Sequence, residues 1–485
     1  MSQGRKPAPA PRRASRPAAL LGLVALVAVG LDALGTGAAA PRSEAPAGAL
    51  DGGPDGPSVV RVRERDGRLA LDVDGEPFVV RGAGLAPLEA RDVGPLVAAF
   101  ADAGGTAFRL WGSLHADALL AAAREHGLKV LVGLDVGTEV GGFDYADDAA
   151  VARQHRDVLD FVERHADDPA VLGWILANEP NLAFAPDGSP RPADPRVYDA
   201  IGALARDIAA RDPNHPLTVA FAFTATLAAD VAAALERVPE LDIVSFQGYG
   251  ALPAIPAAAD ASAPDRPFMI TEFGPLGHWE MPATDWGREI EEPSGVKAAG
   301  IVERMTPTVL EDATGRLVGA FAFLWGWKQE RTPTWYGLFV EGEGRTAAVD
   351  ELSRAWRGRY PENRAPAAAS ITLDGRAPTA SVRVTPAADV VARVVVTDPE
   401  GDPVETRWEL RREVGERSDG GKFEAGAPVV GLGPVASVSR GDEHALTFPA
   451  PDEPGEYRLF AYARDGHGGV ATANVPFLVD AAAVR

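Results

Sequence analysis

The sequence contains no cysteine, which excludes disulfide bonds, thiolate metal sites and a cysteine-linked lipid anchor. Long apolar runs are scarce as well: residues 18–30 fall short of the roughly 20 residues that a membrane-spanning helix needs. Positive charge is outweighed, and the formal net charge of −22 disfavours nucleic acid and anionic membrane surfaces as partners. These absences leave neutral partners as the better expectation.

The amino terminus has the order of a secretory signal peptide. Arg12, Arg13 and Arg16 precede the apolar run, and the small residues 38–40 offer a cleavage site. We therefore expect residues 1–40 to be removed, leaving a protein that is secreted or lies in the periplasm or cell envelope, away from the membrane itself. An uncleaved amino-terminal anchor is the alternative. Residues 41–57, rich in Ala, Gly and Pro, are expected to form a linker.

Residues 58–360 alternate short apolar runs with helical patterns, which is typical of parallel βαβ units. Eight strands, each followed by a helix or a long loop, predict an α/β fold, the (β/α)8 TIM barrel. A doubly wound open sheet is the structural alternative. The runs are residues 78–85, 107–111, 129–134, 171–177, 217–223, 243–246, 267–271 and 317–324.

The remainder of the chain loses the helical period. Residues 361–367 are predicted to be a linker, and residues 368–485 show short alternating segments separated by turns, which predicts a smaller all-β, immunoglobulin-like sandwich. We expect few contacts across the linker, so that the sandwich folds as an independent module. The acidic turn 398–402 could hold calcium, but solvated turn acids are commoner, and the sequence predicts no metal site.

Two of the apolar runs end in a glutamate, Glu179 and Glu272. A carboxylate at the end of a buried strand is unfavourable unless it lies at an open end of the sheet, where it can do chemistry. The two are 93 positions apart, which at about 30 residues per βα unit places them on the fourth and seventh strands. An open sheet gives no reason for that placement. Paired carboxylates across a barrel mouth suit the cleavage of glycosidic bonds.

Neighbouring residues suggest a division of labour between the glutamates. Arg109, at the end of the second strand, is the candidate for keeping Glu272 charged, and Tyr249, after the sixth strand, could donate a hydroxyl. Asn178, beside Glu179, could hold a sugar hydroxyl through its amide.

Aromatic residues supply candidate sugar contacts, because indole faces stack on the apolar faces of sugars. Trp325, which closes the eighth strand, is expected to floor the sugar site, and Trp111 and Trp279 are further candidates. Trp279 belongs, with His278 and Trp286, to the long loop after the seventh strand. Such loops at a barrel's carboxyl face often shape subsites. For these three residues packing is an equal alternative.

Asn178-Glu179-Pro180 at a fourth strand and Thr271-Glu272-Phe273-Gly274 at a seventh, together with Arg109 and Trp325, resemble clan A glycoside hydrolases. Asn-Glu-Pro is similar to glycoside hydrolase family 5, and Glu-Phe-Gly to the barrel of family 2. The resemblance implies that Glu179 is the acid/base and Glu272 the nucleophile, with retention of configuration. It departs from family 5 at Gln247, where that family commonly has histidine.

The sequence thus predicts a secreted retaining β-glycoside hydrolase that acts by double displacement on a β-linked oligo- or polysaccharide. It predicts no cofactor and leaves the oligomeric state open. A transglycosylase would use the same pair of glutamates. From a different class, a non-catalytic glycan-binding envelope protein on a decayed barrel is the rival, although decay would be expected to remove one carboxylate and both are present.

Overall fold

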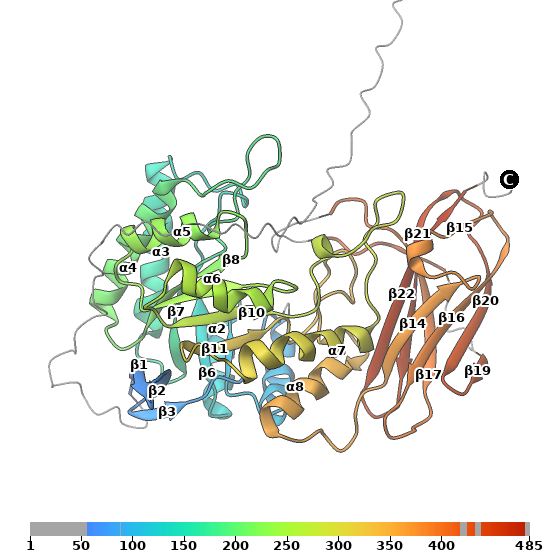
Figure 1. Ribbon diagram of the computed structural model, residues 1–485, viewed down its shortest axis with the longest axis horizontal. Coiled ribbons are helices and arrows are strands. Elements are labelled where there is room, and N and C mark those ends of the chain that lie inside the picture. Colours follow the sequence, from blue (N-terminus) through green and yellow to red (C-terminus); the bar gives the residue numbers. More distant parts are fainter. Residues whose placement is uncertain (1–55, 88, 418–423, 432–437, 481–485) are drawn as a thin grey trace, which may run out of the picture.

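A computed structural model describes residues 56–87, 89–417, 424–431 and 438–480. The predicted signal peptide and nearly all of the predicted linker 41–57 lie outside these residues. Two units follow one another along the described chain (Figure 1). None of the helices in these segments is long and apolar enough to cross a membrane.

The first unit is a closed barrel of eight parallel strands, ordered as in the sequence. Together with the all-β unit that follows, it confirms the predicted fold class. The barrel strands are β4 (Gly82–Gly84), β5 (Ala107–Arg109), β6 (Lys129–Gly133), β7 (Val171–Asn178), β8 (Leu217–Ala222), β9 (Ile243–Gln247), β10 (Phe268–Phe273) and β11 (Leu317–Ala322).

Strand β7 shows why these segments read as continuous apolar runs. Leu172 and Ile175 point into the barrel interior, whereas Trp174 and Leu176 pack in the outer core beneath the helices. Both faces of the strand are buried, so no polar alternation survives in the sequence. The polar residues begin only where the strand reaches the mouth of the barrel, at Asn178.

Helices surround the barrel, and their ends carry conventional signals. Asp147 caps helix α3 by accepting hydrogen bonds from the amides of Ala149 and Ala150, both at 3.0 Å. Helix α4 starts at a proline, the residue favoured at a first helical position. The helices are α1 (Val93–Asp102), α2 (Ala116–Glu125), α3 (Asp148–His165), α4 (Pro195–Arg211), α5 (Leu227–Arg237), α6 (Ile255–Ser262), α7 (Ser294–Met305) and α8 (Ala347–Arg357), with short turns η1 (Ala90–Asp92), η2 (Leu252–Ala254), η3 (His278–Glu280) and η4 (Thr306–Leu310).

A small antiparallel sheet that the sequence analysis did not anticipate covers the amino-terminal end of the barrel. It consists of β1 (Val60–Arg65), β2 (Arg68–Val73) and β3 (Glu76–Phe78), drawn in blue in Figure 1. Val60 and Leu71 complete the apolar cluster of the barrel interior. Just before β1, the buried Ser58 hydroxyl donates to the carbonyl of Val171 at 2.6 Å and lies 3.1 Å from His215 Nε2. This sheet therefore closes the barrel end opposite the glutamates.

The second unit is a sandwich of a four-stranded and a five-stranded sheet. Their strand orders match the ABED and GFC sheets of immunoglobulin domains. Trp408 is buried between the sheets, and the hydroxyl of Tyr457 donates to the carbonyl of Glu453 at 2.9 Å, as in a tyrosine corner. The orders are β14 (Ala367–Leu373), β16 (Asp389–Thr397), β20 (Glu443–Pro449), β19 (Val438–Arg440), and β15 (Arg383–Val384), β22 (Val470–Val479), β21 (Gly455–Arg464), β17 (Glu405–Arg412), β18 (Val429–Gly431), with η5 (Pro378–Ala380) between β14 and β15.

The two units are packed together, contrary to the expectation that few contacts cross between them. Ala365, in the predicted linker, is buried, and its amide donates to Asp350 Oδ2 of α8 at 2.5 Å. The hairpin of β12 (Phe339–Val340) and β13 (Gly344–Arg345) reaches the sandwich, where Val340 joins an apolar cluster with Phe460, Tyr462 and Val470. The linker is thus a packed joint.

A buried carboxylate, Glu291, links the units at the loop that follows β10. It accepts hydrogen bonds from Lys297 of α7 at 2.5 Å, from Thr332 at 2.5 Å and from Thr334 at 2.8 Å. Asn474 of β22 donates to the same carboxylate at 2.5 Å. Four donors around one buried charge tie the sandwich to both of the long loops at the barrel mouth.

Candidate active site

Glu272 lies in the seventh barrel strand, β10, and its carboxylate is held by three donors. Arg109 Nη1 and Trp111 Nε1 donate to Oε1 at 3.1 and 2.7 Å, and the Tyr249 hydroxyl donates to Oε2 at 2.7 Å. The side chain is nearly buried. Three donors, one of them cationic, take the place of water around the carboxyl oxygens. Burial raises the pKa of Tyr249 well above its usual range, so its hydroxyl remains a donor.

Arg109, at the end of β5, organises the site from beneath. Its guanidinium is fully buried, donates to the carbonyl of Thr271 at 2.9 Å, and reaches Asn178 Oδ1 with Nη2 at 2.9 Å. Burial lowers its pKa and the charge of Glu272 opposes that effect. A guanidinium stays protonated in proteins, so Arg109 is a fixed positive charge shared by strands β7 and β10.

The Asn178 side chain has a defined orientation. Its Oδ1 accepts from Arg109 and, at 2.7 Å, from Gln247 Nε2 at the end of β9. The amide nitrogen makes no hydrogen bond with the described residues, and Asn178 lines the cavity at the mouth. Gln247, the departure from family 5, therefore positions Asn178.

Trp111 follows β5 and depends on a glycine for its position. A Cβ on Gly84, at the end of β4, would lie 2.1 Å from the indole ring. Only glycine leaves room for the ring there, and the ring in turn brings its N–H to Glu272. The guanidinium of Arg109 lies 4.6 Å from the centre of the same ring.

Glu179 lies one residue beyond the fourth barrel strand, β7, in a left-handed backbone conformation with φ of 49°. Its amide donates to the carbonyl of Ala220 at 2.7 Å, and Asn181 holds the following turn through both backbone groups of Ala222, each at 2.9 Å. Non-glycine residues adopt this conformation rarely, and such residues cluster at functional sites. The turn fixes Glu179 at the mouth of the barrel.

The two carboxylates have opposite surroundings. Burial, and then the charge of Glu272, raise the pKa of Glu179 to about 8. No hydrogen bond reaches its carboxylate from the described residues, whereas Glu272 has three. At neutral pH the Glu179 side chain is therefore protonated, and the charge of Glu272 opposes its ionisation.

The aromatic wall of the site differs in one residue from the sequence prediction. Phe323 packs edge-on against Trp111, at 5.4 Å, and Tyr249, at 5.8 Å. Trp325, the predicted floor, is fully buried on the other side of the segment, against Phe100 and Trp356, and donates to the carbonyl of Leu96 at 3.1 Å. The structure does not bring Trp325 to the site, because the chain turns at the end of β11 and directs it into the helix layer.

Residues from the long loops complete the wall. Trp279 is half exposed, with its ring 5.6 Å from that of Tyr249, so it stands at the rim. His278 is buried, and its amide donates to the Tyr336 hydroxyl at 3.0 Å. Trp286 lies instead against the sandwich, beneath the guanidinium of Arg383.

A charged cluster beside the wall was missed by sequence reasoning. Glu330 accepts from Lys328 Nζ at 2.5 Å and lies 3.5 Å from His278 Nε2. Burial works to raise the pKa of Glu330, but His278 and Lys328 together hold it below its usual value. The charges of Glu330 and Lys328 both act on Glu179. These residues lie in the loop after β11, which has no periodicity that would have identified them.

Comparison of the sequence with protein-family models finds no match, nor does comparison with curated proteins. Among solved structures, the chain is similar to the Bacteroides uniformis β-glucuronidase, at 15% identity, 87% coverage of this chain and 48% of that one, and a TM-score of 0.47. It is also similar to the GH2 β-galacturonidase of Eisenbergiella tayi, at 14% identity, 63% and 55% coverage, and a TM-score of 0.47. The chain spans about half the length of these proteins.

Proposed function

We propose that this protein is a retaining β-glycoside hydrolase in which Glu272 is the nucleophile and Glu179 the acid/base. The observation that carries the proposal is the unlike environment of two electrostatically interacting glutamates at the ends of the fourth and seventh barrel strands. Glycoside hydrolysis with retention needs one protonated and one ionised carboxyl group at neutral pH. The family resemblance of their sequence motifs supports the same assignment.

In the first step Glu272 attacks the anomeric carbon, and the bond to the leaving oxygen breaks. Glu179 donates its proton to that oxygen, so the leaving group departs as an alcohol and a covalent glycosyl-enzyme remains. Arg109, Trp111 and Tyr249 hold the nucleophile in place, and the amide of Asn178 is available to a sugar hydroxyl.

In the second step water attacks the same carbon and displaces Glu272. Esterification has removed the charge of Glu272, which is one of the two main causes of the raised pKa of Glu179. The Glu179 carboxylate can therefore take the proton of the attacking water. Two displacements at one carbon give net retention.

The central test replaces each glutamate with glutamine. Both Glu179→Gln and Glu272→Gln should lower turnover of β-linked oligosaccharides by at least about a thousandfold, since each removes an essential proton donor or nucleophile. Circular dichroism should show both variants folded. Glu125→Gln, at an exposed carboxylate near the end of α2, serves as the control. Near wild-type rates in either variant would overturn the assignment.

The two roles separate with an activated aryl β-glycoside, whose leaving group needs no proton. Glu179→Ala should still form the glycosyl-enzyme, detectable by mass spectrometry, and azide should rescue it to a β-azide. Glu272→Ala should form no covalent intermediate. The opposite pattern would exchange the roles.

The signal peptide predicted for residues 1–40 supports action outside the cytoplasm. Expression in a secreting host, followed by amino-terminal sequencing of the exported protein, tests this. A mature amino terminus near residue 41 is expected, and retention of residues 1–40 on a membrane fraction would favour an uncleaved anchor.

A further inference from the structure

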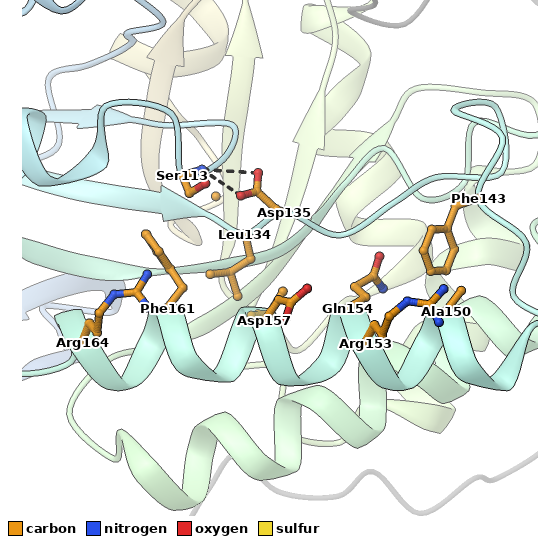
Figure 2. A pocket seen from close by; sticks show the side chains of 12 residues that line it. Ser113, Leu134, Asp135, Phe143, Ala150, Arg153, Gln154, Asp157, Phe161 and Arg164 are labelled. Carbon is orange, nitrogen blue, oxygen red and sulfur yellow. Dashed lines mark hydrogen bonds between the residues drawn. The ribbon is translucent and has the colours of Figure 1, made fainter.

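A cavity of about 470 Å³ opens beside the site, between the carboxyl end of β6 and one face of α3. Figure 2 shows Ser113 and Asp135 on one side and the side chains of α3, among them Gln154 and Asp157, on the other. Its volume lies in the range of small-molecule sites. None of the catalytic steps described above uses it.

This cavity adjoins a smaller one, of about 160 Å³, whose walls include Glu179, Asn178 and Trp111. Leu134 and Asp135 belong to the walls of both. A ligand that reacts at Glu179 can therefore continue past Asp135 into the larger space.

Asp135 is an exposed carboxylate at this junction. Its carboxylate accepts from the amide of Ser113, at 3.3 and 3.2 Å to the two oxygens. A Cβ on Gly112 would lie 2.1 Å from Oδ1, so the carboxylate occupies space that any other residue at position 112 would fill. Further bonds of the two oxygens remain available to a ligand.

The lining of the larger cavity combines apolar rings with exposed charged side chains. Phe143 and Phe161 supply apolar surface. Arg153 and Asp157, one turn apart on α3, make no hydrogen bond or ion pair with the described part of the chain, although both face the cavity. The lining contains two acidic residues, Asp135 and Asp157, and two arginines, Arg153 and Arg164, so its formal charges cancel. Such a surface suits a neutral ligand that has both hydroxyl groups and apolar faces.

We propose that this cavity is a subsite for a second, neutral sugar residue of the substrate, joined to the sugar that reacts at Glu179 and Glu272. This rests on the proposed function and deepens it: the substrate is an oligosaccharide rather than a simple glycoside. Asp135, Arg153 and Asp157 bind hydroxyl groups of the second sugar. We therefore predict that kcat/KM depends on the number of sugar residues in the substrate as well as on the identity of the reacting sugar.

The test compares paired substrates. In wild type we expect kcat/KM to be at least about tenfold higher for a 4-nitrophenyl β-disaccharide, or an unlabelled trisaccharide, than for the matching 4-nitrophenyl β-monosaccharide, since hydrogen bonds to charged groups are strong. The pairs are glucoside with cellobioside and cellotriose, and mannoside with mannobioside and mannotriose. In Arg153→Ala/Asp157→Ala the gain should largely vanish, while monosaccharide kinetics stay within about twofold. Arg156→Ala/Asp160→Ala, exposed positions of the same helix outside the cavity, is the matched control.

The position of the second sugar follows from which substrate responds. A loss on the aryl disaccharide places it on the non-reducing side, and a loss confined to the trisaccharide places it on the leaving-group side. Ala150→Trp, which fills the cavity, should reproduce the loss, whereas Ala152→Trp on the exposed face should not. If wild type cleaves the glycans but neither cavity variant changes the ratio, the subsite is refuted. If wild type cleaves none of them, nor the corresponding galactosides, xylosides and glucuronides, it is the proposed function that fails, and this is visible before any variant is made.

Discussion

At the scale of single residues, the raised pKa of Glu179 makes the reaction depend on pH in a defined direction. An acid catalyst must be protonated, and burial with the charge of Glu272 raises the pKa of Glu179 to about 8. We expect kcat/KM for an unactivated oligosaccharide to fall about tenfold per pH unit above about pH 8, with little change just below it.

The control for this pH dependence is a variant of the other carboxylate, Glu272. Removing a like charge favours ionisation, so Glu272→Gln should lower the pKa of Glu179, measured by ¹³C NMR of labelled glutamate. A pKa that is unchanged in this variant would mean that the carboxylates do not interact. A rate that stays flat to pH 10 would mean that Glu179 is not the acid.

At the scale of elements, the end of β4 is coupled to the nucleophile through a glycine. Gly84→Ala would place a methyl group 2.1 Å from the Trp111 ring, so the indole must move and its bond to Glu272 must break. We expect kcat/KM to fall about ten- to a hundredfold, with melting temperature reduced by a few degrees.

Gly94→Ala in α1 is the comparison, because a Cβ there meets nothing within 4 Å. Alanine is the better helix former, so this variant should be as stable as wild type or more so, with unchanged kinetics. If Gly84→Ala behaves like Gly94→Ala, the position of the Trp111 indole beside Gly84 does not contribute to the reactivity of Glu272.

At the same scale, the structure shows which strands and site residues could be predicted from the sequence. The strands that carry Glu179 and Glu272 were readable because both faces are buried and the polar residues begin where each strand opens to solvent. Arg109 was found because it ends a strand. Trp325 was misplaced because neither hydrophobic periodicity nor residue type reveals the direction in which the chain turns after a strand. Phe323 lies in the aromatic wall where Trp325 had been expected. Gln247 was noted only as a departure from family 5, and Lys328 and Glu330 gave no signal. Gln247 and Glu330 contact Asn178 and His278, which are distant from them in sequence. The β1–β3 sheet was missed because its short strands resemble the start of a barrel.

At the scale of the whole molecule, the sandwich is part of the framework of the site. Besides Asn474, Glu424 accepts from the amide of Arg331 at 2.7 Å and from Gln329 at 3.1 Å, in the loop that carries Tyr336. Calorimetry should therefore show one cooperative unfolding transition for both units. A protein ending at Arg364 should aggregate or lose most activity on small glycosides. Two separate transitions, or a fully active truncated protein, would restore the independent module.

A point variant tests the joint without truncation. Asn474→Asp replaces the amide donor to the buried Glu291 with a carboxylate, so a hydrogen bond becomes a like-charge contact. Arg458, which donates to Asn474 Oδ1 at 2.7 Å, offsets part of that repulsion, and we expect a cost of about 2 kcal/mol. The melting temperature should fall by several degrees and the rate with it. Thr447→Asp, on the exposed face of β20, adds the same charge where water can solvate it and should change neither.

The sheet that closes the barrel has a consequence for how the chain reaches this state. Ser58 contacts Val171 and His215, 113 and 157 positions later, and Val60 donates its amide to the carbonyl of Asn214 at 2.9 Å. Contacts so distant along the chain form late and slow folding. This segment precedes the barrel strands in the chain but can dock only after the later strands that it contacts have formed. Until it does, the apolar interior of the barrel faces water at one end. A chain that emerges amino terminus first must keep this segment waiting until the fifth barrel strand has formed, which makes the interval before docking the period in which aggregation is the main hazard.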